Sequence, residues 1–158
     1  MPYENNTGTN SRNFYGPRSR NEGIEGSYTT DNAISQLAFD ITGANLNDDA
    51  FAFDLSILPA GSKPLRAIFH VDEAFDLGGT SPVISIGTDG SESTNGVDLD
   101  EASAEAVGAY VIDATSFNGT WAARLAANTQ VSVSLGGTTP TSGEGGHMRV
   151  VIEFSKLN

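Results

Sequence analysis

The stretch that decides the fold is the last patterned segment of the chain, His147-Met148-Arg149-Val150-Val151-Ile152-Glu153-Phe154. From Met148 onward every second residue is apolar, and the residues between them are mostly charged or polar. Because successive side chains of a strand point to opposite faces of a sheet, this alternation predicts a half-buried β-strand. The strand ends close to the C-terminus, so we expect it to be tied into a sheet.

The same two-residue period recurs upstream. In residues 51–57, for example, Phe51, Phe53, Leu55 and Ile57 alternate with small or polar residues, which predicts that these four point inward. Comparable alternation marks residues 37–41, 65–71 and 131–135, and shorter strands are expected at 83–86 and 109–112.

Turn and loop residues separate these segments. Glycine, proline, serine and asparagine gather in them, which are the residues that turns require. One segment, residues 100–107, is rich in alanine and glutamate and predicts one or two helical turns. The expected turns and loops are residues 43–49, 58–64, 78–82, 88–96, 118–119 and 136–146.

Short strands separated by turns predict an all-β domain. About seven or eight strands of this kind are typical of an antiparallel sandwich or barrel. No strand–helix–strand alternation is present, which excludes a parallel α/β sheet. The 158 residues are enough for one domain with its own hydrophobic core.

The first 32 residues differ from the rest. They are rich in Asn, Gly, Ser, Thr and Arg, and their few apolar residues show no period, so we expect an extended N-terminal arm at 1–32 and a β-sandwich domain at 33–158. Residues 1–20 carry three arginines and one glutamate, whereas residues 33–158 carry five basic and 16 acidic residues. The sequence therefore joins a mildly basic arm to a strongly acidic body.

Charge and hydropathy exclude several kinds of protein. The formal net charge of −12 would repel nucleic-acid phosphates, so we expect no nucleic-acid partner. No apolar run approaches the roughly 20 residues that span a bilayer, and Met1–Asn6 has no signal-peptide character, so no membrane partner is expected. The chain has no cysteine, which rules out disulfides and thiolate metal sites.

Catalytic and metal-binding patterns are weak. His70 and His147 fall at outward positions of their strands, where a two-histidine metal site would require the strands to pair, and a structural role is the more common one. The loop 89–100 offers oxygen ligands for Ca²⁺ but fails the EF-hand pattern at several positions. Acidic pairs such as Asp72-Glu73 are not placed by any hydrolase motif. We therefore expect no enzyme, no cofactor and no bound metal.

Several strings resemble the head decoration, or cement, proteins of tailed bacteriophages. They lie in the arm, in or next to several of the predicted strands and around the tryptophan, and together they extend over most of the chain. The strings are Asn13–Arg18 (NFYGPR), Leu58–Ser62 (LPAGS), Ala67–Phe75 (AIFHVDEAF), Ile84–Gly90 (ISIGTDG), Gly119–Trp121 (GTW) and Gly145–Phe154 (GGHMRVVIEF).

This resemblance implies a jelly-roll-like β-sandwich of about eight strands with a structural role in the virion. It implies a homotrimer on the outer capsid surface, with the major capsid protein as partner. The protein would be made in the host cytoplasm. The resemblance supplies no residue motif for a site.

The candidate contact residues come from the composition of the arm. Arg12, Arg18 and Arg20 can form paired hydrogen bonds with acidic groups, and Phe14 and Tyr15 can fill pockets as anchors. A segment that orders on its partner covers much surface for its length.

The alternative is a carbohydrate- or receptor-binding module of a phage tail or fibre. It would use Trp121 and Tyr110 as stacking platforms, although a single tryptophan is more often a core or interface residue.

Overall fold

The computed structural model describes residues 34–47 and 51–156, with only the backbone described for residues 51–56. Within it, Ser35–Phe154 forms one compact unit. The predicted arm and its boundary at residue 32 lie outside the described residues and stay a prediction.

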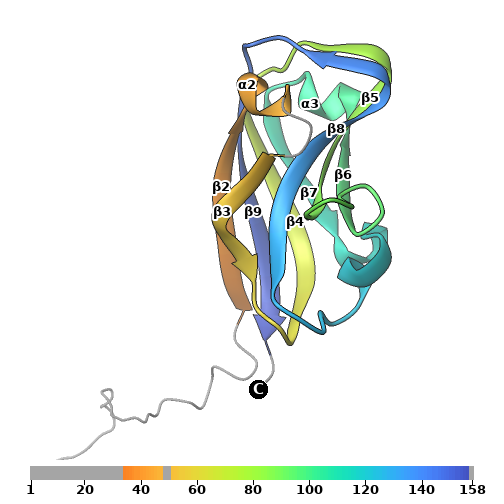
Figure 1. Cartoon of the computed structure of the whole chain (residues 1–158). Helices are drawn as coiled ribbons and strands as arrows, with labels where there is room; N and C mark the ends of the chain where they lie inside the picture. Colours follow the sequence, from red (N-terminus) through yellow and green to blue (C-terminus); the bar gives the residue numbers. More distant parts are fainter. Residues whose placement is uncertain (1–33, 48–50, 157–158) are drawn as a thin grey trace, which may run out of the picture. The chain divides into compact units, whose positions relative to one another are not determined.

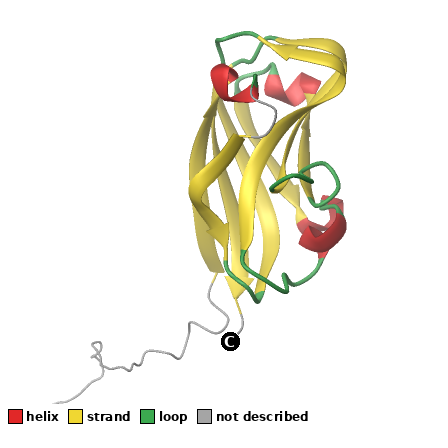
Figure 2. Cartoon of the chain, in the orientation of Figure 1, coloured by secondary structure: helices red, strands yellow, loops and turns green. Residues whose placement is uncertain are grey.

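The described strands form two antiparallel four-stranded sheets that pack face to face (Figures 1 and 2). One sheet has the order β2-β9-β4-β7 and the other the order β3-β8-β5-β6. The strands are β2 (Ile34–Thr42), β3 (Phe51–Leu58), β4 (Ser62–Glu73), β5 (Leu77–Thr88), β6 (Gly96–Asp100), β7 (Gly108–Asp113), β8 (Thr129–Ser142) and β9 (His147–Lys156).

This strand order is that of a jelly roll, as predicted. Except between β5 and β6, successive described strands belong to different sheets, so the chain crosses the sandwich at each connection. The crossings place the first described strand, β2, beside the last, β9. Apart from β5 and β6, neighbouring strands are therefore not consecutive in the sequence, and each sheet forms only when distant segments meet.

The core lies between the sheets and is built by the predicted alternation. In β9 the inward residues Met148, Val150 and Ile152 are fully buried and Phe154 is nearly so, which confirms the prediction for this strand. The inward residues of β4 and β2 behave in the same way. From the first sheet these are Phe39, Ile41, Ala67, Phe69 and Val71, and the second sheet contributes Ile84, Ile86, Val97, Leu99, Val131 and Val133.

The inward register predicted for the end of β3 is wrong. The side chain of Ile57 is 45% exposed, whereas Leu58 is fully buried. The pairing of β3 with β8 shifts register between Ala52 and Ile57. Between these two pairs β3 advances five residues and β8 only two. An odd number of extra residues in one strand turns the following side chains to the other face, so the alternation cannot be extrapolated across the irregularity. The side chains of the other three predicted inward residues of this strand are not described.

Two predicted turns are instead parts of long strands. Residues 78–82 belong to β5, and most of the predicted loop 136–146 belongs to β8, which pairs with β5 from Leu77 opposite Ser142 onward. Register shifts interrupt this pairing, and Gly79 and Gly137 have φ angles of +106° and +122°. Glycine adopts such angles without strain, so residues that usually form turns here form an irregular two-stranded extension.

The remaining short elements partly match the sequence. The helix α3 (Glu101–Ala104) is the predicted helical turn and begins with the Asp100 carboxylate accepting the Ser103 N–H at 2.9 Å. The predicted turn after β2 contains a single helical turn, α2 (Gly43–Leu46). Strand β6 was not predicted, because its five residues include two aspartates and give little alternation.

Candidate functional site

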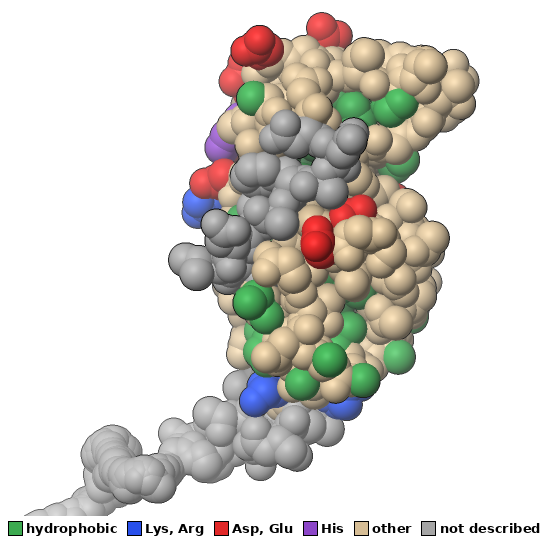
Figure 3. Space-filling model, in the orientation of Figure 1, with side chains coloured by type: hydrophobic (Ala, Val, Ile, Leu, Met, Phe, Trp, Pro, Cys, Tyr) green, Lys and Arg blue, Asp and Glu red, His purple; other side chains and the backbone are tan. Residues whose placement is uncertain are grey.

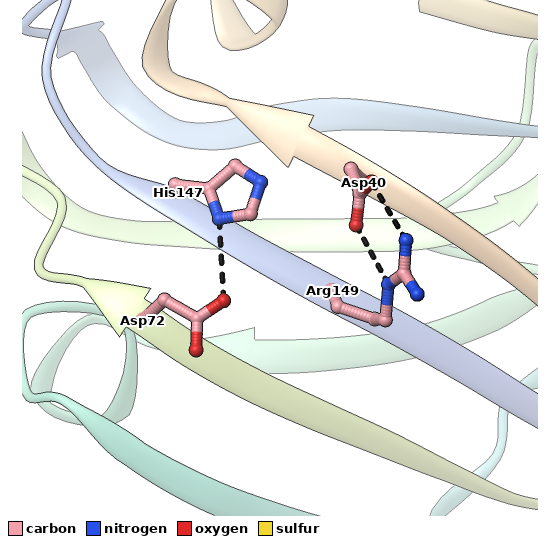
Figure 4. A network of polar contacts seen from close by, with 4 residues as sticks. All are labelled: Asp40, Asp72, His147 and Arg149. Atoms are coloured by element: carbon pink, nitrogen blue, oxygen red, sulfur yellow. Dashed lines mark hydrogen bonds and ion pairs between the residues drawn. The ribbon is translucent and has the colours of Figure 1, made fainter.

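The outward side chains of the β2-β9-β4-β7 sheet form a polar network, and we call this surface the outer face. Arg149 on β9 donates through Nε and Nη2 to the two carboxylate oxygens of Asp40 on β2, at 2.8 and 2.9 Å (Figure 4). These hydrogen bonds lower the pKa of Asp40 and raise that of Arg149. A paired geometry of this kind fixes both side chains and joins neighbouring strands.

A second contact on the outer face joins β9 to β4. The Nδ1 atom of His147 lies 3.4 Å from Oδ2 of Asp72 (Figure 4). His70 and His147 do lie on neighbouring strands, which a two-histidine metal site requires. Among the described residues, however, no group of three or more His, Asp or Glu side chains could hold a metal ion.

A third contact surrounds Glu153. Its carboxylate accepts a hydrogen bond from Arg66 Nε at 2.7 Å and another from Gln36 Nε2 at 3.1 Å. Glu153 is only 7% exposed although it points to the outer face, where the side chains of Arg66 and Gln36 lie against it. The hydrogen bond from Arg66 is the main reason that the pKa of Glu153 is lowered.

Between these polar contacts lies a row of apolar side chains. The pairs Gln36–Glu153 and Asp40–Arg149 set the alignment of β2 with β9, and moving two residues from either pair brings Ala38 beside Val151. The contacts of Arg66 with Glu153 and of Asp72 with His147 align β4 with β9 in the same way, and they bring Ile68 beside Val151. On the other side of β4, Ile68 pairs with Val111 on β7. The apolar row therefore consists of Ala38, Val151, Ile68 and Val111, and it crosses all four strands.

On the opposite sheet, loop 89–95 folds over part of the outward surface of the described strands. The N–H of Thr88 donates to Asn95 O at 2.9 Å, and the N–H of Thr120 donates to Asn95 Oδ1 at 2.9 Å. The loop lies so close that a Cβ added at Gly87 would be 2.4 Å from Asn95 O. Glycine at this position is required for the loop to lie against the sheet.

The acidic groups around this loop are engaged within the protein. Glu92 is 6% exposed, and its carboxylate accepts hydrogen bonds from the Gly90 N–H at 2.8 Å and from Ser132 Oγ. Burial opposes the ionisation of Glu92, yet these bonds lower its pKa overall. Asp98 accepts from Ser85 Oγ at 2.6 Å. Among the oxygens that could bind Ca²⁺, those of Asn95 and Asp98 therefore already accept hydrogen bonds within the protein.

Trp121 is not an exposed stacking platform, contrary to the alternative considered from the sequence. Its side chain is fully buried, its Nε1 donates to Thr88 Oγ1 at 3.1 Å, and its ring packs edge-on against Phe117 with centroids 6.1 Å apart. Tyr110 is partly buried, and its hydroxyl donates to Ala106 O at 3.0 Å. A carbohydrate site built on this tryptophan is excluded by its burial.

The predicted contact residues Arg12, Phe14, Tyr15, Arg18 and Arg20 lie outside the described residues and stay a prediction. The outer face was not predicted from the sequence. A signal for it was present, since Ile68 and Val151 are apolar residues at outward positions of well-patterned strands.

No helix in the described part of the chain is long and apolar enough to cross a membrane. No protein-family model matches the sequence, and neither does any curated protein. The fold is similar to that of a chain in the solved structure titled "Capsid of Ralstonia phage GP4". The TM-score is 0.53 and the sequence identity 19%, over 80% of this chain and 86% of that one. The similarity is one of fold.

Proposed function

We propose that this protein is a structural component of a phage virion that binds the outer surface of the capsid and stabilises it, as a decoration or cement protein. The observation that carries the proposal is the jelly-roll fold shared with a chain of a phage capsid. The sequence resemblance to phage decoration proteins points the same way. The proposed partner is the major capsid protein, and the proposed state on the capsid is a homotrimer.

The distribution of basic groups favours the arm as the contact segment. Acidic side chains are prominent on the face in Figure 3, and residues 33–158 carry a net charge of −11. Most basic side chains of the body already have acceptors within the protein. Arg66 and Arg149 pair with carboxylates, and Lys63 and Arg124 donate to the backbone oxygens of Ala122 and Gly61.

The arm adds three arginines that can pair with acidic groups on a capsid, and two aromatic residues that can act as anchors. Many copies bound to one lattice also reinforce each other, so no single contact has to be tight. We therefore assign capsid binding to Arg12, Arg18, Arg20, Phe14 and Tyr15.

The test mixes full-length protein with capsids that lack it and measures occupancy by cryo-electron microscopy. We expect wild-type protein to fill a defined set of sites. The double variant Arg12→Glu/Arg18→Glu should leave most of them empty, because it replaces attraction by repulsion. Deleting residues 1–28 should likewise give a folded body that no longer binds.

The matched control is Lys63→Glu/Lys156→Glu. It changes the net charge by the same amount but outside the arm, and we expect it to keep occupancy close to the wild-type level. Capsids that take up no wild-type protein would contradict the function. Full binding by the arm variants would contradict the assignment of the contact residues.

A further inference from the structure

The strands at the ends of the two sheets differ in how they are protected from pairing with another chain. An open strand edge presents unpaired N–H and C=O groups, and proteins usually block it with charges, bulges or covering segments. In the second sheet, β3 has a register shift, and β6 carries two aspartates and accepts a hydrogen bond from the Asn118 N–H at Gly96 O. Both of these edges are therefore protected.

Within residues 34–47 and 51–156, strand β7 at the end of the first sheet has none of these features along most of its length. It pairs with β4 over six consecutive residues without a register shift. Residues 107–112 contain no charged residue and no proline. The exposed apolar side chains of Val107 and Val111 are 67% and 59% accessible. An uncharged, regular edge with exposed valines is well suited to accept another strand.

The apolar row of the outer face leads to the same edge. It ends at Val111, so a strand added beside β7 would continue the row rather than end it at solvent. The polar contacts beside the row leave little unpaired positive charge on this face, since Arg66 and Arg149 are each bound to a carboxylate.

We propose that β7 pairs with β7 of a second copy of this chain, antiparallel and about a two-fold axis, to form a continuous eight-stranded sheet. This inference goes beyond the proposed function and does not depend on it. A two-fold axis is the most common symmetry of soluble oligomers, and it brings identical surfaces together.

The distribution of charge supports a second copy as the partner and an antiparallel direction for the added strand. Two copies with a net charge of −12 repel each other, so a surface of the body that is locally uncharged favours their contact. In antiparallel pairing centred on Val111, Asp113 lies opposite the uncharged Ala109 of the other copy. A parallel arrangement would place the two Asp113 carboxylates side by side, which is unfavourable.

The test measures the mass of the full-length protein in solution by sedimentation velocity over a range of concentrations. We expect a monomer–dimer equilibrium. Val111→Lys places two like charges near the two-fold axis and should weaken the dimer by about tenfold or more. The matched control Ile57→Lys introduces the same charge at an exposed residue of a protected edge strand and should dimerise as the wild type does.

Hydrogen exchange gives a second measurement that needs no variant. On dimerisation, amides in Gly108–Asp113 that point away from β4 should exchange more slowly, whereas those of β3 should not change. A wild-type protein that stays monomeric at the highest concentration, or forms a trimer in free solution, would overturn the proposal. So would protection that is independent of concentration in β7. All these measurements are made without capsids, so their failure is separate from failure of the proposed function.

Discussion

At the scale of single residues, the outer face shows how an acidic protein places its few basic groups. Glu153 is a nearly buried acid that stays ionised because Arg66 and Gln36 both donate to it. A buried carboxylate without such partners would have a raised pKa, whereas that of Glu153 is lowered. The ion pairs therefore connect strands that are distant in sequence, with the additional effect of neutralising charge beside the apolar row.

Replacing Glu153 tests this pairing. Glu153→Gln should lower the free energy of unfolding at pH 7 by about 1 kcal/mol, since the ion pair is lost but Arg66 is half exposed and recovers hydration. A lowered pKa in the folded state stabilises the fold above the usual value of 4.5, and this contribution is lost as the pH falls through the folded value. The difference from wild type should therefore shrink on acidification below about pH 4.5.

The measurement is urea denaturation followed by circular dichroism at several pH values. Glu144→Gln, at an exposed acid of the connection between β8 and β9, serves as control and should have little effect. A difference that stayed constant down to pH 2 would show that the ionised form of Glu153 does not matter.

At the scale of elements, irregular strands set the limits of the alternation rule. The register shift in β3 moves the inward position from Ile57 to Leu58, and the shifts between β5 and β8 allow glycine-rich segments to remain paired. Bulges bend and twist a strand, which lets these long pairs follow the curvature of the sandwich.

The adjacent residues Ile57 and Leu58 give a direct test of the bulge. Leu58→Ala should destabilise the protein by about 2–5 kcal/mol, because it leaves a cavity in the core. Ile57→Ala should change the stability by no more than about 1 kcal/mol, since nearly half of this residue is exposed and its loss leaves no closed cavity. Urea denaturation of both variants tests the register. A larger loss of stability for Ile57→Ala than for Leu58→Ala would show that Ile57, and not Leu58, is the inward residue.

At the scale of the whole molecule, the two sheets have different surroundings. The outer face of the β2-β9-β4-β7 sheet is bare within the described residues, whereas loop 89–95 lies on the other sheet. In an assembly protein, this difference leaves the outer face of the first sheet available for contacts with other proteins, while the second sheet supports the loop. In the proposed function, the basic arm then supplies the charge that the body lacks.

Salt dependence distinguishes arm binding from binding through the apolar row. Raising the salt concentration from about 0.1 M to about 1 M shortens the screening length from about 10 Å to about 3 Å. Capsid occupancy at limiting protein concentration should therefore fall several-fold if arginines of the arm make the contact. Occupancy that is unchanged or higher at high salt would instead indicate that an apolar surface of the body binds the capsid.

The sequence by itself determined the fold class and most inward residues, because the period of a strand is a local property. The alternation in residues 147–154 and 65–71 identified β9 and β4, and turn residues marked several of the connections. Local patterns could not predict β6, whose short, acidic sequence becomes a strand through pairing with β5. For the same reason they placed turns at 78–82 and 136–146, where pairing partners override the preference of glycine for turns.

Only the tertiary structure decided which strands are neighbours and what the outer face contains. The contacts of Arg149 with Asp40 and of Arg66 with Glu153 join residues 109 and 87 positions apart. Their proximity follows from the order β2-β9-β4, which no local period contains. The burial of Trp121 and the open edge of β7 were also decided at this level, because both depend on which segments the folded chain places beside them.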